Sequence, residues 1–399
     1  MGVQATEIAL APPGVAVGHR RRVARRRRLR TAVLVVVVAL VAPLAWSYGS
    51  ALAAGGTDGL GVRSVEWLKD HGGAGLVRWV EKEWYSHHAP PVGGRPDPRL
   101  VNKFAKGHVG ASVAAAWPPH LAAPTPIAPL AAPLPDEGVW HPVGRLVGGR
   151  PAVYATWVRP DAVHTSLVTG VAWIDTRLVR ATLFAGYQEP GGAGWRYTAP
   201  IPPALATTLV AAFNSGFRLR DGAGGYYSEG RTVRPLRDGL ASLVIRSDGT
   251  ATVGQWGRDV SMSPQVDSVR QNLSLIVDGG APVPGLDTES YRRWGSTLGN
   301  KVLVWRSGVG VTASGALVYA GGRGLSVGSL AQVLARAGAV RAMELDINTE
   351  WVSFYYFNPP VGQPASPANG SKLVADMYRP TTRYFLPSSR DFFAFFARY

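Results

Sequence analysis

One segment near the N-terminus, Thr31–Ala54, has no charged side chain over 24 residues. As a helix it would be about 36 Å long, enough to cross a hydrocarbon core of about 30 Å. The preceding residues 20–30 contain eight arginines. Because positive charge is retained in the cytoplasm, we predict a basic cytoplasmic tail at 1–30 and a transmembrane signal-anchor at 31–54. The chain is then a single-pass protein of the cell membrane, with the lipid bilayer as a partner and its main domain extracytoplasmic.

The same apolar segment can be interpreted as a cleaved signal peptide. Ala51-Leu52-Ala53 has the small-x-small pattern that signal peptidase accepts, which would give a secreted form. The run is longer than the core of a usual signal peptide, and this favours an uncleaved anchor. A twin-arginine export signal is a third interpretation. All three place the main domain outside the cytoplasm.

The formal net charge of +16 does not indicate a nucleic-acid partner. Residues 1–30 account for +7 of it, because eight arginines are offset by Glu7. The remaining charge is scattered and lacks the basic stripe with interleaved aromatics that strand-binding surfaces use. An exported basic surface suits anionic envelope glycopolymers or lipid headgroups, although a merely solvated basic surface accounts for the same composition.

Two segments separate the anchor from the main domain. Residues 55–85 carry apolar side chains at helical spacing, interrupted at Gly72-Gly73, which predicts two juxtamembrane amphipathic helices. Their tryptophans would lie at the headgroup level or pack on the main domain. Residues 86–137 are rich in Pro and Ala, and frequent prolines deny hydrogen bonds to helices and sheets. We therefore predict a semi-rigid extended linker there.

The remaining residues, 138–399, predict an α+β domain of mostly antiparallel strands with few helices. Short runs rich in Val, Tyr, Trp and Thr alternate with Gly or Pro, as is typical of strands. ASLVIRSDGTATVGQW and GVGVTASGALVYAG predict hairpins that turn at Asp248-Gly249 and Ser314-Gly315. SVGSLAQVLARAG predicts a helix capped by Ser326 and closed by Gly338. The C-terminal DFFAFFARY is expected to pack its aromatics on the body.

The distribution of cysteine and histidine limits the chemistry. The chain has no cysteine, and its last histidine is His164. Disulfides, thiolate nucleophiles and cysteine-ligated metals are therefore excluded. Within residues 165–399, Ser-His-Asp or Cys-His catalysis and histidine-ligated metals are excluded as well. An enzyme built there depends on carboxylates, amides, hydroxyls and arginine.

The run RAMELDIN is the best candidate for a catalytic centre. If it is a strand, Glu344, Asp346 and Asn348 share one face while Met343, Leu345 and Ile347 share the other, in the core; we predict that the two carboxylates are catalytic. Their β-carbons would be about 6–7 Å apart, and rotamers can then give the spacing that glycosidases use. The repulsion of like charges raises one pKa, as a general acid needs. No cofactor is required, although the oxygens could bind a divalent cation such as calcium. The alternative is a solvated outer face of an edge strand.

Two further segments predict substrate contacts. Asn214-Ser215-Gly216-Phe217 follows an apolar strand, and the Asn214 amide could contact a sugar or phosphate. Arg306 and Ser307 lie between two apolar runs, where an arginine can grip a phosphate with two hydrogen bonds. A simple turn and a surface arginine are the alternatives. Glu229 is a minor acid candidate in a turn.

In their order along the chain, these segments resemble the phosphodiester glycosidase family, whose domain is of the N-acetylglucosamine-1-phosphodiester alpha-N-acetylglucosaminidase type. Its Asn-Gly-Gly-Phe-like, Pro-Arg-Thr-like and Asn-Leu-Asp-Gly-Gly-Gly-Ser-Ser-like motifs correspond to Asn214–Phe217, Trp305–Ser307 and Glu344–Trp351. The resemblance covers roughly residues 205–355, with flanks similar to those of membrane-anchored actinobacterial members. The glycine triplet is Ile347-Asn348-Thr349 here, which narrows the space for a ligand.

The resemblance implies hydrolysis of a sugar 1-phosphodiester, with Asn214, Arg306 and Asp346 in the positions of the family's site residues. Glu344 replaces an asparagine of the family motif. Our leading hypothesis is a membrane-tethered hydrolase acting on phosphodiester-linked sugars of envelope glycopolymers. The rival is a binding protein that keeps the fold without hydrolysis, and the third interpretation is a structural envelope protein.

Overall fold

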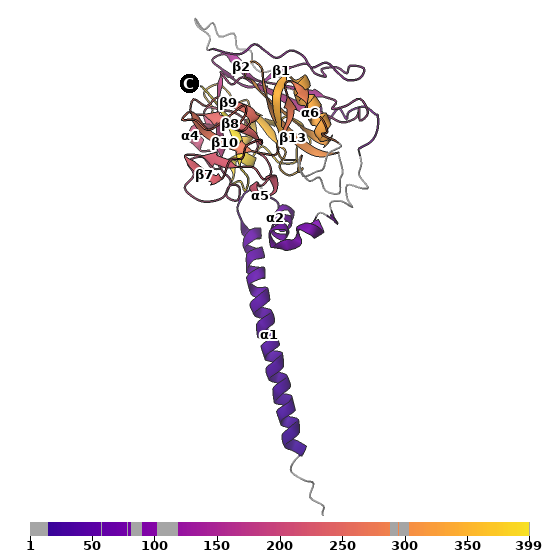
Figure 1. Ribbon diagram of the computed structural model, residues 1–399, viewed down its shortest axis with the longest axis vertical. Coiled ribbons are helices and arrows are strands. Elements are labelled where there is room, and N and C mark those ends of the chain that lie inside the picture. Colours follow the sequence, from indigo (N-terminus) through magenta and orange to yellow (C-terminus); the bar gives the residue numbers. More distant parts are fainter. Residues whose placement is uncertain are drawn as a thin grey trace, which may run out of the picture.

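The computed structural model describes residues 15–56, 58–77, 79–80, 90–101, 119–287, 294 and 303–398. The body consists of three antiparallel sheets with few helices, and a long N-terminal helix projects from it (Figure 1). This confirms the predicted α+β class.

The largest sheet has eight strands and supports the candidate site. Helix α6, Val327–Arg336, packs against its central strands. The strand order is β1 (His141–Val147), β2 (Arg150–Val158), β3 (Thr169–Ile174), β14 (Leu317–Leu325), β13 (Val304–Thr312), β15 (Ala339–Glu344), β11 (Leu275–Asp278) and β12 (Ala281–Pro282).

Two five-stranded sheets complete the body. The first has the order β17 (Gly370–Lys372), β16 (Phe354–Phe357), β5 (Leu209–Asn214), β18 (Phe392–Ala397) and β4 (Val179–Phe184). The second has the order β7 (Arg231–Arg234), β6 (Tyr226–Ser228), β10 (Val266–Gln271), β8 (Ala241–Arg246) and β9 (Ala251–Gln255). Short helices α4 (Pro203–Ala206) and α5 (Leu219–Gly222) flank β5, and 3-10 turns occupy Pro367–Asn369 and Arg383–Phe385. The main core contains Val153, Phe213 and Leu243, one from each sheet.

The predicted hairpins and helix are confirmed. β8 pairs with β9 and β13 with β14, and Gly249 and Gly315 have φ of 80° and 90° in the two turns. Such positive φ values favour glycine. Ser326 caps α6 by accepting from Ser329 N at 2.9 Å, and Gly338 follows it with φ 93°.

One segment is shorter than predicted, and the C-terminal aromatics pack on the body as predicted, within a strand. β15 ends at Glu344, whereas a strand over the whole run RAMELDIN would continue to Asn348. The C-terminal aromatics form β18, which is inserted between β4 and β5 by antiparallel pairing. Its alternate side chains therefore enter cores on both faces of the sheet, and Phe392 and Phe393 are both buried.

Ser326→Ala should lower the free energy of unfolding by about 1 kcal/mol, because the first turn of α6 loses its side-chain cap. Urea denaturation of the two proteins measures the difference. Ser261→Ala, at an exposed loop position, is the control and should change stability by less than about 0.5 kcal/mol. Equal effects of the two substitutions would contradict the capping role.

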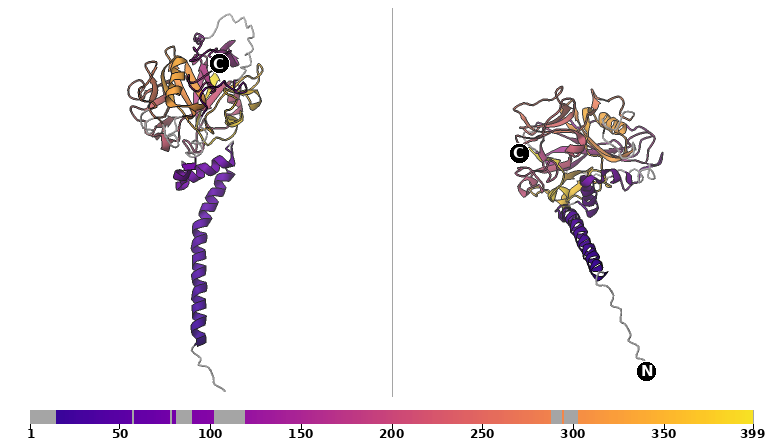
Figure 2. Two further views of the ribbon diagram at one scale, coloured as in Figure 1. Left: turned by 90° about the vertical axis from the view of Figure 1, so that its right-hand side faces the viewer. Right: turned by 60° about the horizontal axis from the view of Figure 1, so that its bottom comes forward.

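The N-terminal helix α1 spans Val15–Ala53. Within its part from Arg25 to Ala53, an 18-residue stretch has a mean hydropathy of 2.2 and is not buried by the rest of the chain, so this part is compatible with a membrane span or an export signal. Topology and cleavage stay predictions. Helix α2 (Leu60–Leu68) and the π-helical turn Lys69–Gly73 follow at the base of the body (Figures 1 and 2).

The juxtamembrane segment bends near the predicted break, where Gly72 has φ 88°. Trp67 packs on α1: its Nε1 donates to Ser47 Oγ at 3.0 Å, and its ring stacks on His71. Trp79 is exposed, and Trp84 lies outside the described residues. The tryptophans therefore do not share one environment.

The described part of the Pro/Ala-rich linker packs on the body. Leu121 and Ile127 are buried in the core beneath α6. Leu121 N donates to the Asp175 carboxylate at 2.7 Å, and Glu137 forms a buried ion pair with Arg159 at 2.6 Å. Residues 119–137 thus cover the domain, which differs from the extended linker that the sequence predicted.

Candidate functional site

Strands from two sheets end side by side at the candidate site. β5 ends at Asn214, and β13 pairs with β15 so that Gly308 lies opposite Glu344. Beyond β15, Asp346 N donates to Ser215 O at 3.2 Å, and Ser307 N donates to Asp346 O at 3.2 Å. The backbone of Asp346 thus bridges the two sheets and brings the three sequence motifs together.

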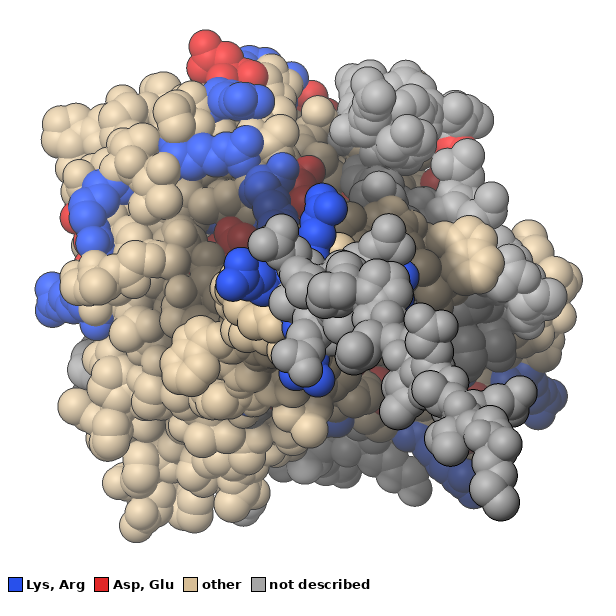
Figure 3. Space-filling model, turned by 90° about the horizontal axis from the view of Figure 1, so that it is seen from below, with Lys and Arg blue, Asp and Glu red and all other residues tan. Residues whose placement is uncertain are grey.

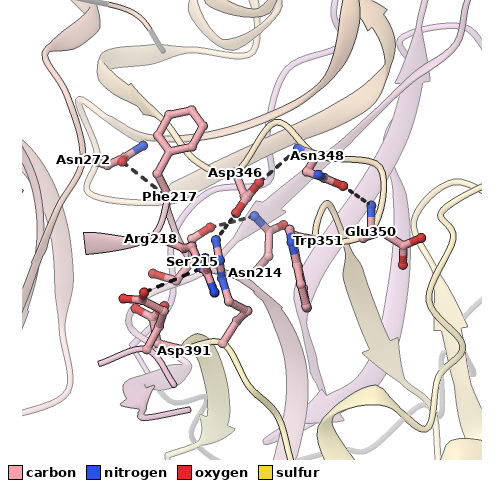
Figure 4. Close-up of polar contacts among 12 residues, drawn as sticks. Asn214, Ser215, Phe217, Arg218, Asn272, Asp346, Asn348, Glu350, Trp351 and Asp391 are labelled. Atoms are coloured by element: carbon pink, nitrogen blue, oxygen red, sulfur yellow. Dashed lines mark hydrogen bonds and ion pairs between the residues drawn. The ribbon is translucent and has the colours of Figure 1, made fainter. Parts of the chain in front are cut away.

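Asp346 is a buried carboxylate with two partners (Figure 4). Arg390 Nη2 lies 2.6 Å from its Oδ2, and Asn348 N donates to its Oδ1 at 3.0 Å. Burial raises the pKa of Asp346; Arg390 and the Asn348 N–H oppose this, and the charge of Glu66 in α2 raises it further. The carboxyl group is therefore less acidic than a solvated aspartate.

Glu344 is fully buried and pairs with a different arginine. Arg306 Nη1 lies 2.5 Å from Glu344 Oε1, and Arg306 Nε donates to Leu325 O at 2.9 Å. Burial raises the pKa of Glu344 to about 7; the charge and hydrogen bond of Arg306 oppose this, and the charge of Asp346 adds to it. The charge of Asp346 therefore reaches Glu344, but each of the two carboxyl groups is paired with its own arginine.

Glu344→Gln should remove part of the pH dependence of stability. The unfolded chain releases this proton near the ordinary pKa of 4.5, and the folded chain near 7. Because the folded state keeps the proton longer, the free energy of unfolding of the wild type falls as the pH rises through this window. Relative to E344Q, the fall should be about 3 kcal/mol. Urea denaturation from about pH 4 to about pH 8 measures it, and a pH-independent difference would contradict the expectation.

Protein groups occupy all the hydrogen-bonding positions of the Asn214 amide. Its Nδ2 donates to Ser215 O at 2.9 Å and to Ser307 Oγ at 3.0 Å. Its Oδ1 accepts from Tyr319 OH and from Ser353 N, both at 3.0 Å. Ser307 Oγ in turn donates to Asp346 O at 2.8 Å. This geometry gives Asn214 and Ser307 a positioning role, and their predicted substrate contacts stay predictions.

The other predicted site residues differ in their burial and in their location. Arg306 and Ser307 lie inside β13 and are buried, whereas the sequence placed them between two runs. Asn348 is partly exposed beside Asp346, and its Oδ1 accepts from Glu350 N at 2.8 Å. Glu229 caps the backbone of another turn through Arg196 N and Tyr197 N.

Arginines far apart in the sequence complete the site, and sequence reasoning missed them. Three arginines surround the Trp351 ring. The guanidinium carbon of Arg379 lies 4.8 Å from the ring centre, that of Arg383 lies 5.4 Å from it, and that of Arg390 lies 5.0 Å from it. Arg218 follows the Asn214–Phe217 motif directly, which is the one local signal that could have pointed to it. Positive charge gathered beside a carboxylate suits an anionic ligand.

The described residues contain no group of three or more His, Asp or Glu side chains able to hold a metal ion. At Asp346, the Arg390 guanidinium takes the place next to Oδ2 that a cation would need. The predicted option of calcium therefore gains no support from the arrangement of these side chains.

Residues 207–347 match the model of the phosphodiester glycosidase family. The matched range includes Asn214, Arg306, Glu344 and Asp346, and supports the resemblance at these positions. No curated protein matches the chain.

Two solved structures are similar at a low level. The catalytic domain of zebrafish N-acetylglucosamine-1-phosphodiester alpha-N-acetylglucosaminidase, auto-inhibited by its pro-peptide, shares 17% identity at a TM-score of 0.39, over 62% of this chain and 84% of that chain. A protein from Synechocystis shares 14% identity at a TM-score of 0.34, over 63% of each chain. The resemblance to phosphodiester glycosidases therefore rests on the family match over residues 207–347.

Proposed function

We propose that the chain is an exported, membrane-tethered hydrolase that cleaves sugar 1-phosphodiesters of cell-envelope glycopolymers. The observation that carries this proposal is Asp346, a buried carboxylate held 2.6 Å from Arg390 at the point where the three family-like motifs meet. The family match over residues 207–347 supports the same reaction class.

The chemistry of the leaving group fits such a site. Hydrolysis adds water to C1 of the sugar and breaks the bond from C1 to the phosphate oxygen. The phosphate leaves as a monoester, whose second pKa is about 6, so it needs positive charge nearby more than a strong acid. A carboxylate that acts at C1 or on water, with arginines for the phosphate, supplies both needs.

We assign the reaction to Asp346 and a positioning role to Glu344. Glu344 is fully buried and engaged by Arg306, so it influences the reaction through the charge and placement of Asp346. Asn214 and Ser307 hold the Asp346 backbone, and Asn348, partly exposed, orients the sugar. Direct catalysis by Glu344 and phosphate binding by Arg306 would need these ion pairs to open.

The full-length protein in detergent micelles, incubated with a synthetic sugar 1-phosphodiester, tests this function. We expect release of free sugar and phosphomonoester in equal amounts, measured by ³¹P NMR and a reducing-sugar assay. Absence of both products for all common envelope sugars would overturn the proposal.

The alternative is a non-catalytic protein that binds envelope glycopolymer. The substitution of Ile347-Asn348-Thr349 for the family's glycines favours it, because side chains there limit the approach of a ligand. This alternative expects saturable binding of purified polymer without release of sugar.

A further inference from the structure

The juxtamembrane segment contacts the candidate site through its carboxylates. Glu66 Oε2 lies 2.7 Å from Arg218 Nη2, and Asp70 Oδ1 lies 2.9 Å from Arg218 Nη1 and 2.6 Å from Arg220 Nη1. Glu66 and Asp70 are four residues apart, so they lie on one face of this segment. That face of the segment therefore contacts the start of helix α5, which follows the Asn214–Phe217 motif.

Charge, with little apolar burial, holds this segment in place. Neither α2 nor the turn Lys69–Gly73 has a buried residue; the first buried side chain after them is Val77. The preceding loop is held in the same way, by Asp58 with Arg379 at 3.1 Å and with Ser389 at 2.6 Å. A contact built from polar pairs exchanges readily with an anion that offers the same hydrogen bonds.

Two arginines on this side of the body are buried. The side chains of Arg218 and Arg390 are 7% and 6% exposed; Arg218 pairs with Glu66, and Arg390 pairs with Asp346. Ser215, drawn beside Arg218 in Figure 4, has a buried hydroxyl that makes no hydrogen bond to any described residue. Basic and acidic side chains are both visible on the face of the molecule seen from below (Figure 3).

A carboxylate and a phosphodiester are chemically alike at this position. Each is a monoanion whose two terminal oxygens can accept from one guanidinium. The charge of Glu66 also reaches Asp346 and Arg390, where it contributes to the pKa of both groups. The Glu66 carboxylate thus contacts an arginine that directly follows the Asn214–Phe217 motif, within electrostatic reach of Asp346.

We propose that Arg218 and Arg390 bind the phosphate of the substrate, and that the Glu66 carboxylate occupies this phosphate site until an anion displaces α2. The inference rests on the proposed function, since it takes the substrate to be a phosphodiester. It assigns the phosphate to Arg218 and to the N–H groups of Arg390 other than the Nη2 that contacts Asp346, and it leaves Arg306 paired with Glu344.

Binding of dimethyl phosphate tests the site without any turnover, because this phosphodiester has no sugar. The full-length chain in detergent micelles is titrated and followed by ³¹P NMR. Glu66→Gln removes the competing charge, and we expect it to bind at least about tenfold more tightly than the wild type. Asp278→Asn removes a carboxylate from an arginine pair elsewhere, at 2.8 Å from Arg258, and should bind like the wild type.

Arg218 provides the second half of the experiment. Adding Arg218→Gln to E66Q should abolish the gained binding, and adding Arg218→Lys should weaken it, because an ammonium cannot form the paired hydrogen bonds. Circular dichroism checks that each variant is folded. If the variant with R218Q does not fold, the variant with R218K alone tests the role of Arg218. Addition of dimethyl phosphate should also speed amide hydrogen exchange in residues 60–73 of the wild type.

Equal affinity of E66Q and wild type would overturn the proposal, as would full binding by E66Q with either Arg218 substitution. The result is separable from the proposed function. If dimethyl phosphate binds as expected and no sugar phosphodiester is hydrolysed, the anion site stands and the enzyme assignment fails. If the sugar phosphodiester is hydrolysed but the Glu66 and Arg218 variants bind dimethyl phosphate like the wild type, the enzyme assignment stands and the anion site fails.

Discussion

Asp346→Asn should lower the rate of sugar phosphodiester cleavage by on the order of 10³-fold. Asparagine keeps the shape of the side chain and can still accept from Arg390, but it cannot take a proton from water or attack C1. The variant should also lose roughly 3 kcal/mol of stability, because the buried guanidinium of Arg390 loses its charged partner. The rate is therefore measured per folded molecule, well below the unfolding transition.

Glu137→Gln is the matched control. Glu137 is also a buried carboxylate, 2.6 Å from Arg159, but it belongs to the linker and to none of the three motifs. It should cost similar stability and leave the rate per folded molecule unchanged. If D346N kept more than about a tenth of the wild-type rate, Asp346 would not be the reacting group.

Phe213→Ala should lower the free energy of unfolding by about 3–5 kcal/mol. The Phe213 ring is fully buried, and its centre lies 5.1–6.0 Å from those of four other aromatic rings. These rings belong to Tyr319, Phe354, Phe393 and Phe395. Truncation therefore leaves a cavity between the largest sheet and the sheet of β5, directly beside Asn214.

Urea denaturation measures this loss, with Tyr378→Ala as the control. Tyr378 is 60% exposed, so its truncation should change stability by less than about 0.5 kcal/mol. A loss below about 1.5 kcal/mol for F213A would mean that the aromatic cluster repacks around the gap.

Local signals predicted much of the fold. The turns at Gly249 and Gly315 and the cap at Ser326 depend on neighbouring residues only, so the sequence alone was sufficient for the hairpins and for α6. The packing of Leu121 and Ile127 was not predictable in this way, because Pro/Ala composition describes the backbone and does not indicate which surface covers it.

Local signals predicted only part of the candidate site, because some of its contacts join residues far apart in the sequence. Alternation along a strand placed Glu344 and Asp346 on one face. β15 instead ends at Glu344, and Asp346 N donates a hydrogen bond to the carbonyl of Ser215, which follows β5 of another sheet. Arg390 lies 44 residues from its partner Asp346, and no local pattern joins the two. Contacts of this kind follow from the topology of the sheets.

The short connection from α1 to α2 bears on how the protein would find its substrate. Only residues 54–59 separate the two helices, a reach of at most about 20 Å. With α1 inserted in a bilayer, the Arg218 and Asp346 region is confined to a thin layer above the lipid surface. Encounters then occur by lateral diffusion in two dimensions, so turnover would follow the number of target molecules per unit of membrane area, and dilution of the surrounding medium would leave it unchanged.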